Sequence, residues 1–85
     1  LRPKDVAILD SLGWLKYKQG NLHEAMTLLM GAYEQSEDPE IARHLIEVMI
    51  IQGQQQEAKA LLVRMIQQYP DDERLKSMQK KIIDI

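Results

Sequence analysis

Cysteine is absent from the 85 residues of this chain, so disulfide bridges, thiolate zinc sites and cysteine nucleophiles are excluded. Phenylalanine is also absent, and the aromatic residues are one tryptophan and three tyrosines, so aliphatic side chains and five methionines must supply the core. No apolar run exceeds four residues. Since roughly 20 apolar residues are needed to span a bilayer, we expect no direct membrane insertion within this fragment.

Charge of one sign does not dominate the chain either. The 11 basic and 13 acidic residues give a net charge of -2, and no basic stripe is present to neutralise phosphates, so we expect no nucleic-acid partner. The length fits a single small domain over residues 1–85, near the lower end of chains that fold alone. Because the chain begins at Leu1 rather than methionine, we interpret it as a fragment or a processed product of a longer protein.

The most informative feature of the sequence is an internal repeat. A shift of 33 positions aligns Gln19-Gly20 with Gln52-Gly53, Glu24-Ala25 with Glu57-Ala58, and Leu29 with Leu62. The same shift aligns Leu12 with Leu45 and then with Met78, which indicates a third unit that stops after one helix. A fixed period of this length is typical of stacked helical hairpins.

Each unit is predicted to contain two helices. Apolar residues recur at helical spacing over residues 4–18, 22–35, 39–51, 54–68 and 72–83. Gly20 and Gly53 mark the turn inside each unit, and we expect Asn21 and Asp38 to cap the helices that follow them, with Pro39 in the first helical position. The chain is therefore predicted to be all-α, with repeats over about 6–38 and 39–71 and a capping helix over about 72–84.

Three small residues have predicted packing roles. Gly13 lies inside a helix, where glycine costs about 1 kcal/mol relative to alanine, so we expect a neighbouring helix to approach it closely. Ala25 and Ala58 occupy equivalent places in the second helix of each unit. Alanine at these places would let the two helices of a hairpin cross at about 8–10 Å.

The pattern resembles the tetratricopeptide repeat, whose motif has a Leu-Gly pair in the first helix, a glycine in the turn, alanines in the second helix and a proline near the end. The first unit has Leu12-Gly13, Gly20, Ala25, Leu29 and Ala32, and the second has Leu45, Gly53, Ala58, Leu62 and Pro70. The second unit departs from the motif where Ile46 replaces glycine and Met65 replaces alanine, and in the first unit Glu37 replaces the proline. The resemblance implies an α-solenoid of two helix–turn–helix hairpins plus a C-terminal capping helix.

A finer resemblance concerns the parent protein. The segments over residues 10–14 and 38–45 are similar to the last repeats of bacterial tetratricopeptide lipoproteins and related scaffolds. This similarity implies a longer bacterial solenoid in the periplasm or at the outer membrane, with a cytoplasmic location as the alternative.

No constellation of residues indicates catalysis. His23-Glu24 begins like the helical zinc-protease motif, but Thr27 stands where the second histidine must be. His44 is too isolated from His23 to form a metal site, and the glycines are too scattered to form a phosphate loop. We therefore expect no catalytic, metal-ligating or cofactor-binding residues, and the chain is not predicted to be an enzyme.

The candidate partner-binding residues lie in the first helix of each unit. The resemblance implies that these first helices line the concave face of the solenoid. Helical spacing places three residues on the exposed side of the helix expected over 4–18, away from Leu9, Leu12 and Leu15: Asp10, Trp14 and Tyr17. The repeat carries this set onto Arg43, Glu47 and Ile50, and then onto Lys76 and Lys80. Aromatic residues and arginine are typical interface hot spots. Trp14 has a second interpretation, in which it packs against a preceding repeat.

Two functions follow from this reading. The first is a protein-interaction module, a scaffold or adaptor that binds a peptide or protein partner on the concave face. The alternative is a structural role, in which these are terminal repeats that cap a longer array and have no partner site of their own. In that case Ile8, Trp14 and Leu15 would expose apolar surface at the N-terminal end, through which the fragment could self-associate.

Overall fold

The computed structural model describes residues 5–83, with side chains as far as Ile82, and this part of the chain contains helices and turns but no strand. The helices are α1 (Val6–Lys18), α2 (Leu22–Gln35), α3 (Pro39–Ile51), α4 (Gln55–Gln68) and α5 (Glu73–Ile83). The all-α prediction is confirmed, and the predicted helix ends differ from the observed ones by at most two residues. Residues 4 and 84, where the first helix and the capping segment were expected to begin and end, lie outside the described residues.

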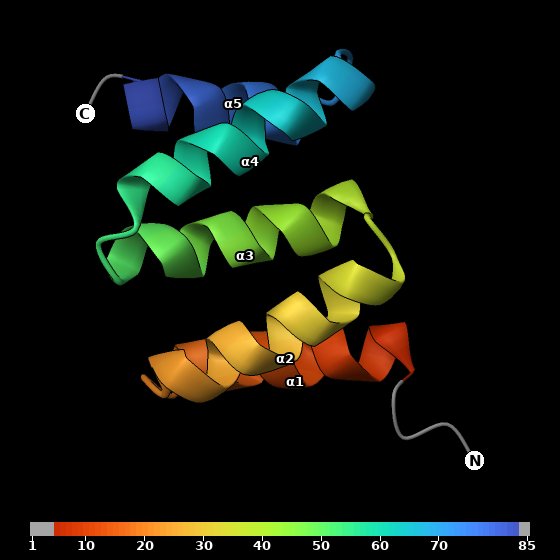
Figure 1. Ribbon diagram of the computed structural model, residues 1–85, viewed down its shortest axis with the longest axis vertical. Helices are drawn as coiled ribbons and strands as arrows, with labels where there is room; N and C mark the ends of the chain where they lie inside the picture. The colour runs from red at the N-terminus through yellow and green to blue at the C-terminus, as the bar shows by residue number, and fades with distance from the viewer. Residues whose placement is uncertain (1–4, 84–85) are drawn as a thin grey trace.

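The helices stack in chain order along the long axis of an elongated molecule of 40 × 25 × 17 Å (Figure 1). α1 and α2 form one antiparallel hairpin, α3 and α4 form the next, and α5 packs against α4. In addition, α2 packs against α3, and the first helices α1, α3 and α5 contact one another in sequence. This arrangement is a solenoid of two hairpins closed by a final helix.

Local sequence signals explain where two of the later helices begin. Asp38 Oδ1 accepts a hydrogen bond of 2.8 Å from the backbone N–H of Glu40, with Pro39 in the first helical position, as predicted. Asp72 Oδ1 accepts from the backbone N–H groups of Arg74 and Leu75 at 3.0 and 3.1 Å, and so caps α5 in the same way.

The prediction that Asn21 caps α2 through its side chain is wrong, because the structure gives Asn21 no side-chain capping bond. Asp38, which does cap, has an extended backbone with ψ of 137°, whereas Asn21 has ψ of 74°. Asn21 follows Gly20, whose φ of 85° is left-handed, and its backbone N–H donates instead to the Lys16 carbonyl at 2.9 Å. The tight glycine turn therefore sets the start of α2 without a side-chain cap.

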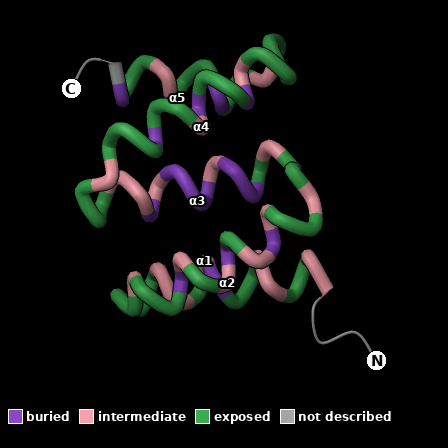
Figure 2. The backbone as a smooth tube through the Cα atoms, in the orientation of Figure 1, coloured by how far each residue is buried: buried purple, intermediate pink, exposed green. Residues whose placement is uncertain are grey.

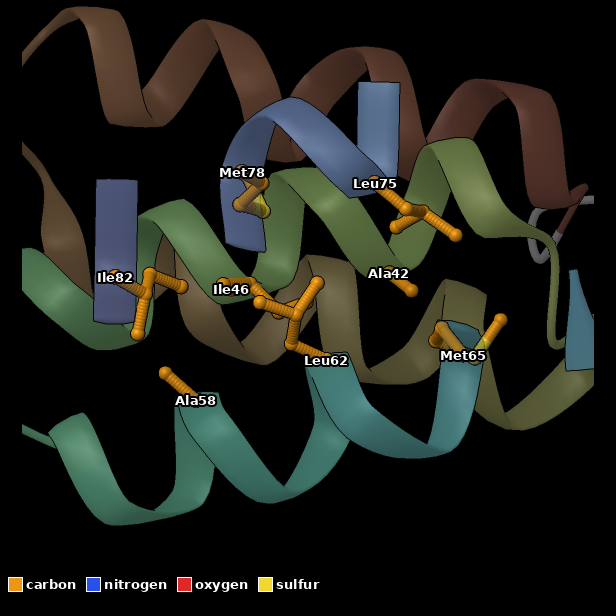
Figure 3. Close-up of a cluster of buried hydrophobic side chains, with 8 residues drawn as sticks. All are labelled: Ala42, Ile46, Ala58, Leu62, Met65, Leu75, Met78 and Ile82. Atoms are coloured by element: carbon orange, nitrogen blue, oxygen red, sulfur yellow. The ribbon is translucent and has the colours of Figure 1, made fainter. Parts of the chain in front are cut away.

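Buried positions are concentrated in α3, the central helix of the stack, and recur at intervals along the other helices (Figure 2). The larger cluster joins α3, α4 and α5 and consists of Ala42, Ile46, Ala58, Leu62, Met65, Leu75, Met78 and Ile82 (Figure 3). A second cluster joins α2 to α3 and consists of Ala25, Leu29, Leu45 and Val48. Tyr33, Met49 and Leu61 pack against both clusters, so the two clusters form one continuous core.

The small residues have the packing roles that the sequence predicted. Ala25 and Ala58 are both 0% exposed in the crossings of their helices. A methyl group added at Gly13 would lie 2.7 Å from Leu29 Cγ, which is far inside van der Waals contact. α1 and α2 therefore approach each other closely at Gly13, and glycine is required there for steric reasons.

Candidate functional site

The apolar stripe of α1 does not face the core as predicted. Leu12 and Leu15 are 42% and 50% exposed, so the expectation that they face inward, away from an exposed Asp10–Trp14–Tyr17 side, is wrong. The close contact at Gly13 determines the rotation of α1, because Leu12 and Leu15 lie about 100° and 160° around the helix from Gly13. This rotation turns the three predicted site residues partly toward α3.

His44 of α3 is the centre of the contact between α1 and α3. Its Nδ1 lies 2.8 Å from Asp10 Oδ1, and the two side chains are only 10% and 17% exposed. The Trp14 ring stacks on the imidazole with centroids 4.1 Å apart and also stacks on Tyr17 at 4.7 Å. The structure thus brings Asp10, Trp14 and Tyr17 together around a histidine to which the sequence assigned no such role.

Glu47 extends this cluster along α3. Burial raises the pKa of Tyr17 above its ordinary value of 10.0, and both the charge of the Glu47 carboxylate and its hydrogen bond with the phenol add to the rise. The Lys18 ammonium lies 5.5 Å from the centroid of the Trp14 ring, on the edge of the same cluster. Aromatic and hydrogen-bonded side chains therefore fill the seam between α1 and α3 around His44. A cavity of about 320 Å³ remains at the N-terminal ends of the two helices, lined by Val6, Ala7, Asp10, Asp38, Glu40 and Ile41.

Open cavities lie between α3 and α5, and we call them together the α3–α5 trough. A cavity of about 400 Å³ and another of about 290 Å³ share three lining residues, Arg43, Glu73 and Arg74. The second cavity shares Glu47, Met78 and Lys81 with a third, smaller cavity of about 170 Å³. Because neighbouring cavities share their walls, they form one continuous trough along both helices.

The predicted site residues divide between the seam and the trough. Arg43, Glu47 and Ile50 of α3 all line the trough. Lys76 and Lys80 of α5 are exposed, and α5 contributes other residues to the trough walls, including Arg74, Ser77 and Lys81. Sequence reasoning missed this second set, although Ser77 is the repeat equivalent of His44, 33 positions further along the chain.

The described residues contain no group of three or more histidine, cysteine, aspartate or glutamate side chains that could hold a metal ion. None of the helices in this part of the chain has the length and apolar character that a bilayer crossing requires.

Comparison with known proteins identifies the repeat. The chain matches the family model of the tetratricopeptide repeat over residues 16–82. A TPR repeat-containing protein of Pseudomonas aeruginosa is 49% identical to it over 47 residues, which are 55% of this chain and 8% of that relative. No solved structure gives a significant match. Repeats of this kind generally mediate protein–protein interactions, and their proteins are typically non-enzymatic scaffolds. With the family model covering most of a chain folded as stacked helical hairpins, this protein belongs to the tetratricopeptide repeat family.

Proposed function

We propose that this chain is a non-enzymatic protein-interaction module, which binds a peptide or protein partner on the concave face formed by α1, α3 and α5. The observation that supports this proposal is the α3–α5 trough, an open and continuous surface on the first helices. Its walls mix half-buried arginine with apolar side chains, a composition suited to interface hot spots. The proposed residues remain Asp10, Trp14, Tyr17, Arg43, Glu47, Ile50, Lys76 and Lys80.

Affinity capture with matched arginine variants tests this proposal. Arg43→Ala removes a guanidinium from the trough, whereas Arg64→Ala removes one from α4, where Arg64 pairs with Glu37 at 3.1 Å on the surface. We expect Arg43→Ala, alone or combined with Trp14→Ala, to reduce recovery of the bound partner, and Arg64→Ala to leave it unchanged. Equal recovery by all folded variants would contradict binding through the first-helix face.

A second function, a structural role in a longer array, is favoured by a different observation. Ile8, Leu12 and Leu15 are exposed by 51%, 42% and 50%, whereas their repeat equivalents Ile41, Leu45 and Val48 are exposed by 4%, 2% and 0%. The equivalents are covered because α2 packs against α3. The exposed stripe of α1 therefore has the shape and chemistry of a surface that another helix covers.

In this second role the isolated chain self-associates through the stripe, because exposed apolar surface of this kind favours burial. Sedimentation of the wild-type chain over a range of concentrations would detect this association, and Leu12→Glu should abolish it. Val63→Glu is the matched control, since Val63 is a 52% exposed aliphatic residue on α4. A wild-type chain that stays monomeric at every concentration would contradict self-association.

A further inference from the structure

We propose that the α1 stripe, the exposed side of α1 formed by Ile8, Leu12 and Leu15, binds the same stripe of a second copy of this chain. The two α1 helices run antiparallel about a two-fold axis that passes between Ser11 and Leu12, so Ile8 of each copy faces Leu15 of the other. This proposal rests on the structural role proposed above, in which the isolated chain self-associates. It adds which surface covers the stripe and the symmetry of the resulting pair.

The α1 stripe has the spacing of a seam between two packed helices. Ile8, Leu12 and Leu15 are separated by four and three positions and are exposed by 51%, 42% and 50%. They cover about 60° of the helix circumference, which is narrower than the apolar face of about 100° or more that a helix buries against a whole core. Ala7 and Ser11 are small and exposed beside the stripe, so a second helix can approach it closely. The stripe therefore has the width that one other helix covers.

Helix α3 shows what covers this stripe when it is buried. The repeat places Leu45 and Val48 of α3 at the positions of Leu12 and Leu15. Leu45 and Val48 pack in one cluster with Ala25 and Leu29 of α2. The covering surface on α3 is thus the aliphatic side of a helix, and the α1 stripe is itself a surface of this class.

A second copy of the chain offers one such surface, which is its own α1 stripe. Seven large hydrophobic side chains are exposed in the described residues, and three of them form the stripe. The other four are dispersed, with one on each of α2, α3 and α4 and one directly after α4: Met30, Ile51, Val63 and Tyr69. The stripe therefore finds its best apolar match in its own copy, and a surface that binds itself forms a closed two-fold pair.

The surface of α5 disfavours the alternative, in which copies stack head to tail. α1 and α5 lie toward opposite ends of the stack (Figure 1). As far as Ile82, the exposed residues of α5 are charged except for one serine: Glu73, Arg74, Lys76, Ser77, Lys80 and Lys81. Burial of these groups under an aliphatic stripe would remove their hydration without supplying polar partners. The stripe of one copy is therefore not matched by α5 of the next.

The lysines of α1 favour an antiparallel pair over a parallel one. Lys16 and Lys18 lie in the last turn of α1, on opposite flanks of the stripe. In a parallel pair, Lys16 of each copy would lie beside Lys18 of the other, and the like charges would repel. In the antiparallel pair the lysines lie at opposite ends of the interface, each toward the end at which Asp5 caps α1 of the other copy. The dipoles of the two helices are then opposed as well.

The pair is expected to be weak, because each copy contributes a single helix. Stable protein interfaces bury about 1,200–2,000 Å² in total. Three half-exposed aliphatic side chains and their small neighbours in each copy supply an area at the lower end of this range or below it. The pair should therefore form as the concentration rises, dissociate on dilution, and be lost when a charge replaces one residue of the stripe.

Cross-linking through a single cysteine tests the symmetry, because the chain has no cysteine of its own. Ser11→Cys places a thiol beside the proposed axis, close to the same thiol of the second copy, and leaves the stripe intact. With a short bismaleimide we expect a covalent dimer, at a yield at least about tenfold above that of Ser77→Cys, because pairing raises the effective concentration of the thiols. Ser77→Cys is the matched control, since exposed Ser77 is the repeat equivalent of Ser11 on α5. Addition of Leu12→Glu to Ser11→Cys should remove the dimer, and addition of Val63→Glu should not.

The outcomes separate this pair from the self-association on which it rests. Cross-links between Ser11→Cys and Ser77→Cys in a mixture of the two variants would show head-to-tail stacking, and equal yields for the two variants alone would show association through another surface. Either result would overturn the two-fold pair and leave self-association in place. A wild-type chain that stays monomeric at every concentration would overturn both. Binding of the monomer to vesicles of anionic phospholipid, lost in Leu12→Glu, would assign the stripe to a membrane surface and overturn the pair as well.

Discussion

His44 Nδ1 and Asp10 Oδ1 lie 2.8 Å apart across the first helices of consecutive hairpins. A carboxylate only accepts hydrogen bonds, so the imidazole donates from Nδ1. The two side chains are 10% and 17% exposed, and the Trp14 ring stacks on the imidazole at 4.1 Å. This buried polar contact joins the first helices of the two hairpins.

Asp10→Ala should lower the free energy of unfolding by about 1–3 kcal/mol, because it leaves the buried imidazole of His44 without its partner. Asp10→Asn keeps an acceptor oxygen at the same position and should cost clearly less. Urea denaturation followed by Trp14 fluorescence measures both losses. If Asp10→Ala were as stable as wild type, the contact would be incidental to the packing of α1 on α3.

Gly13→Ala and Gly31→Ala should change stability in opposite directions. A Cβ at Gly13 would lie 2.7 Å from Leu29 Cγ, so the crossing of α1 and α2 must widen, at a cost of about 1–3 kcal/mol. A Cβ at Gly31 meets only Leu9 Cδ1 at 3.9 Å, so alanine there should stabilise α2 by about 0.5–1 kcal/mol. Thermal unfolding of both variants checks the signs, and a gain in stability for Gly13→Ala would contradict the close crossing.

Ala58→Leu should destabilise the chain by about 1–3 kcal/mol, because Ala58 is 0% exposed in the cluster that joins α3, α4 and α5. Ala60→Leu makes the same change at an exposed position two residues along α4 and should stay within about 0.5 kcal/mol of wild type. Urea denaturation of the two variants gives the comparison. If Ala58→Leu lost as little stability as Ala60→Leu, helix α4 would tolerate leucine at either position and its crossing with α3 would not be close.

The helices, their turns and the small residues at their crossings were predictable from the sequence, because glycine, proline and capping aspartate act over a few residues. The rotation of α1 about its own axis was not predictable from the sequence. Apolar residues surround most of this helix, so spacing alone did not distinguish the stripe of Leu12 and Leu15 from the side that carries Gly13. The close approach of Leu29 to Gly13 decides between them, and this is a contact between two helices.

The seam around His44 and the trough around Ser77 depend on side-chain size across pairs of helices. The repeat places Trp14 and Glu47 at equivalent positions, but only the structure shows which residue each of them faces. A comparison of the residues facing one another in each seam would have predicted the open trough, had the rotation of the helices been known. The sequence therefore predicted which face of the solenoid carries the candidate site. It did not predict that the α3–α5 trough is the open part of that face.

Tyr17 should titrate above its ordinary pKa of 10.0, chiefly because burial disfavours the phenolate and also because the Glu47 carboxylate repels it and binds the phenol. Glu47→Gln removes the charge and leaves the burial, so it should lower the pKa of Tyr17 without returning it fully to the ordinary value. The ultraviolet absorbance of tyrosinate measures this pKa in a chain that carries Tyr33→Phe and Tyr69→Phe. Glu57→Gln, an exposed change on α4, is the matched control.

The same shift predicts how stability depends on pH. Because the pKa of Tyr17 is higher in the folded chain than in the unfolded chain, its contribution is fully present below about pH 10 and is lost as the pH rises through the folded value. The loss of stability in alkaline solution should therefore be smaller in Tyr17→Phe than in the wild-type chain, as measured by urea denaturation at a series of pH values. An identical alkaline loss in both chains would mean that Tyr17 is no more shielded from water in the fold than in the unfolded state, and that the aromatic seam between α1 and α3 is open to solvent.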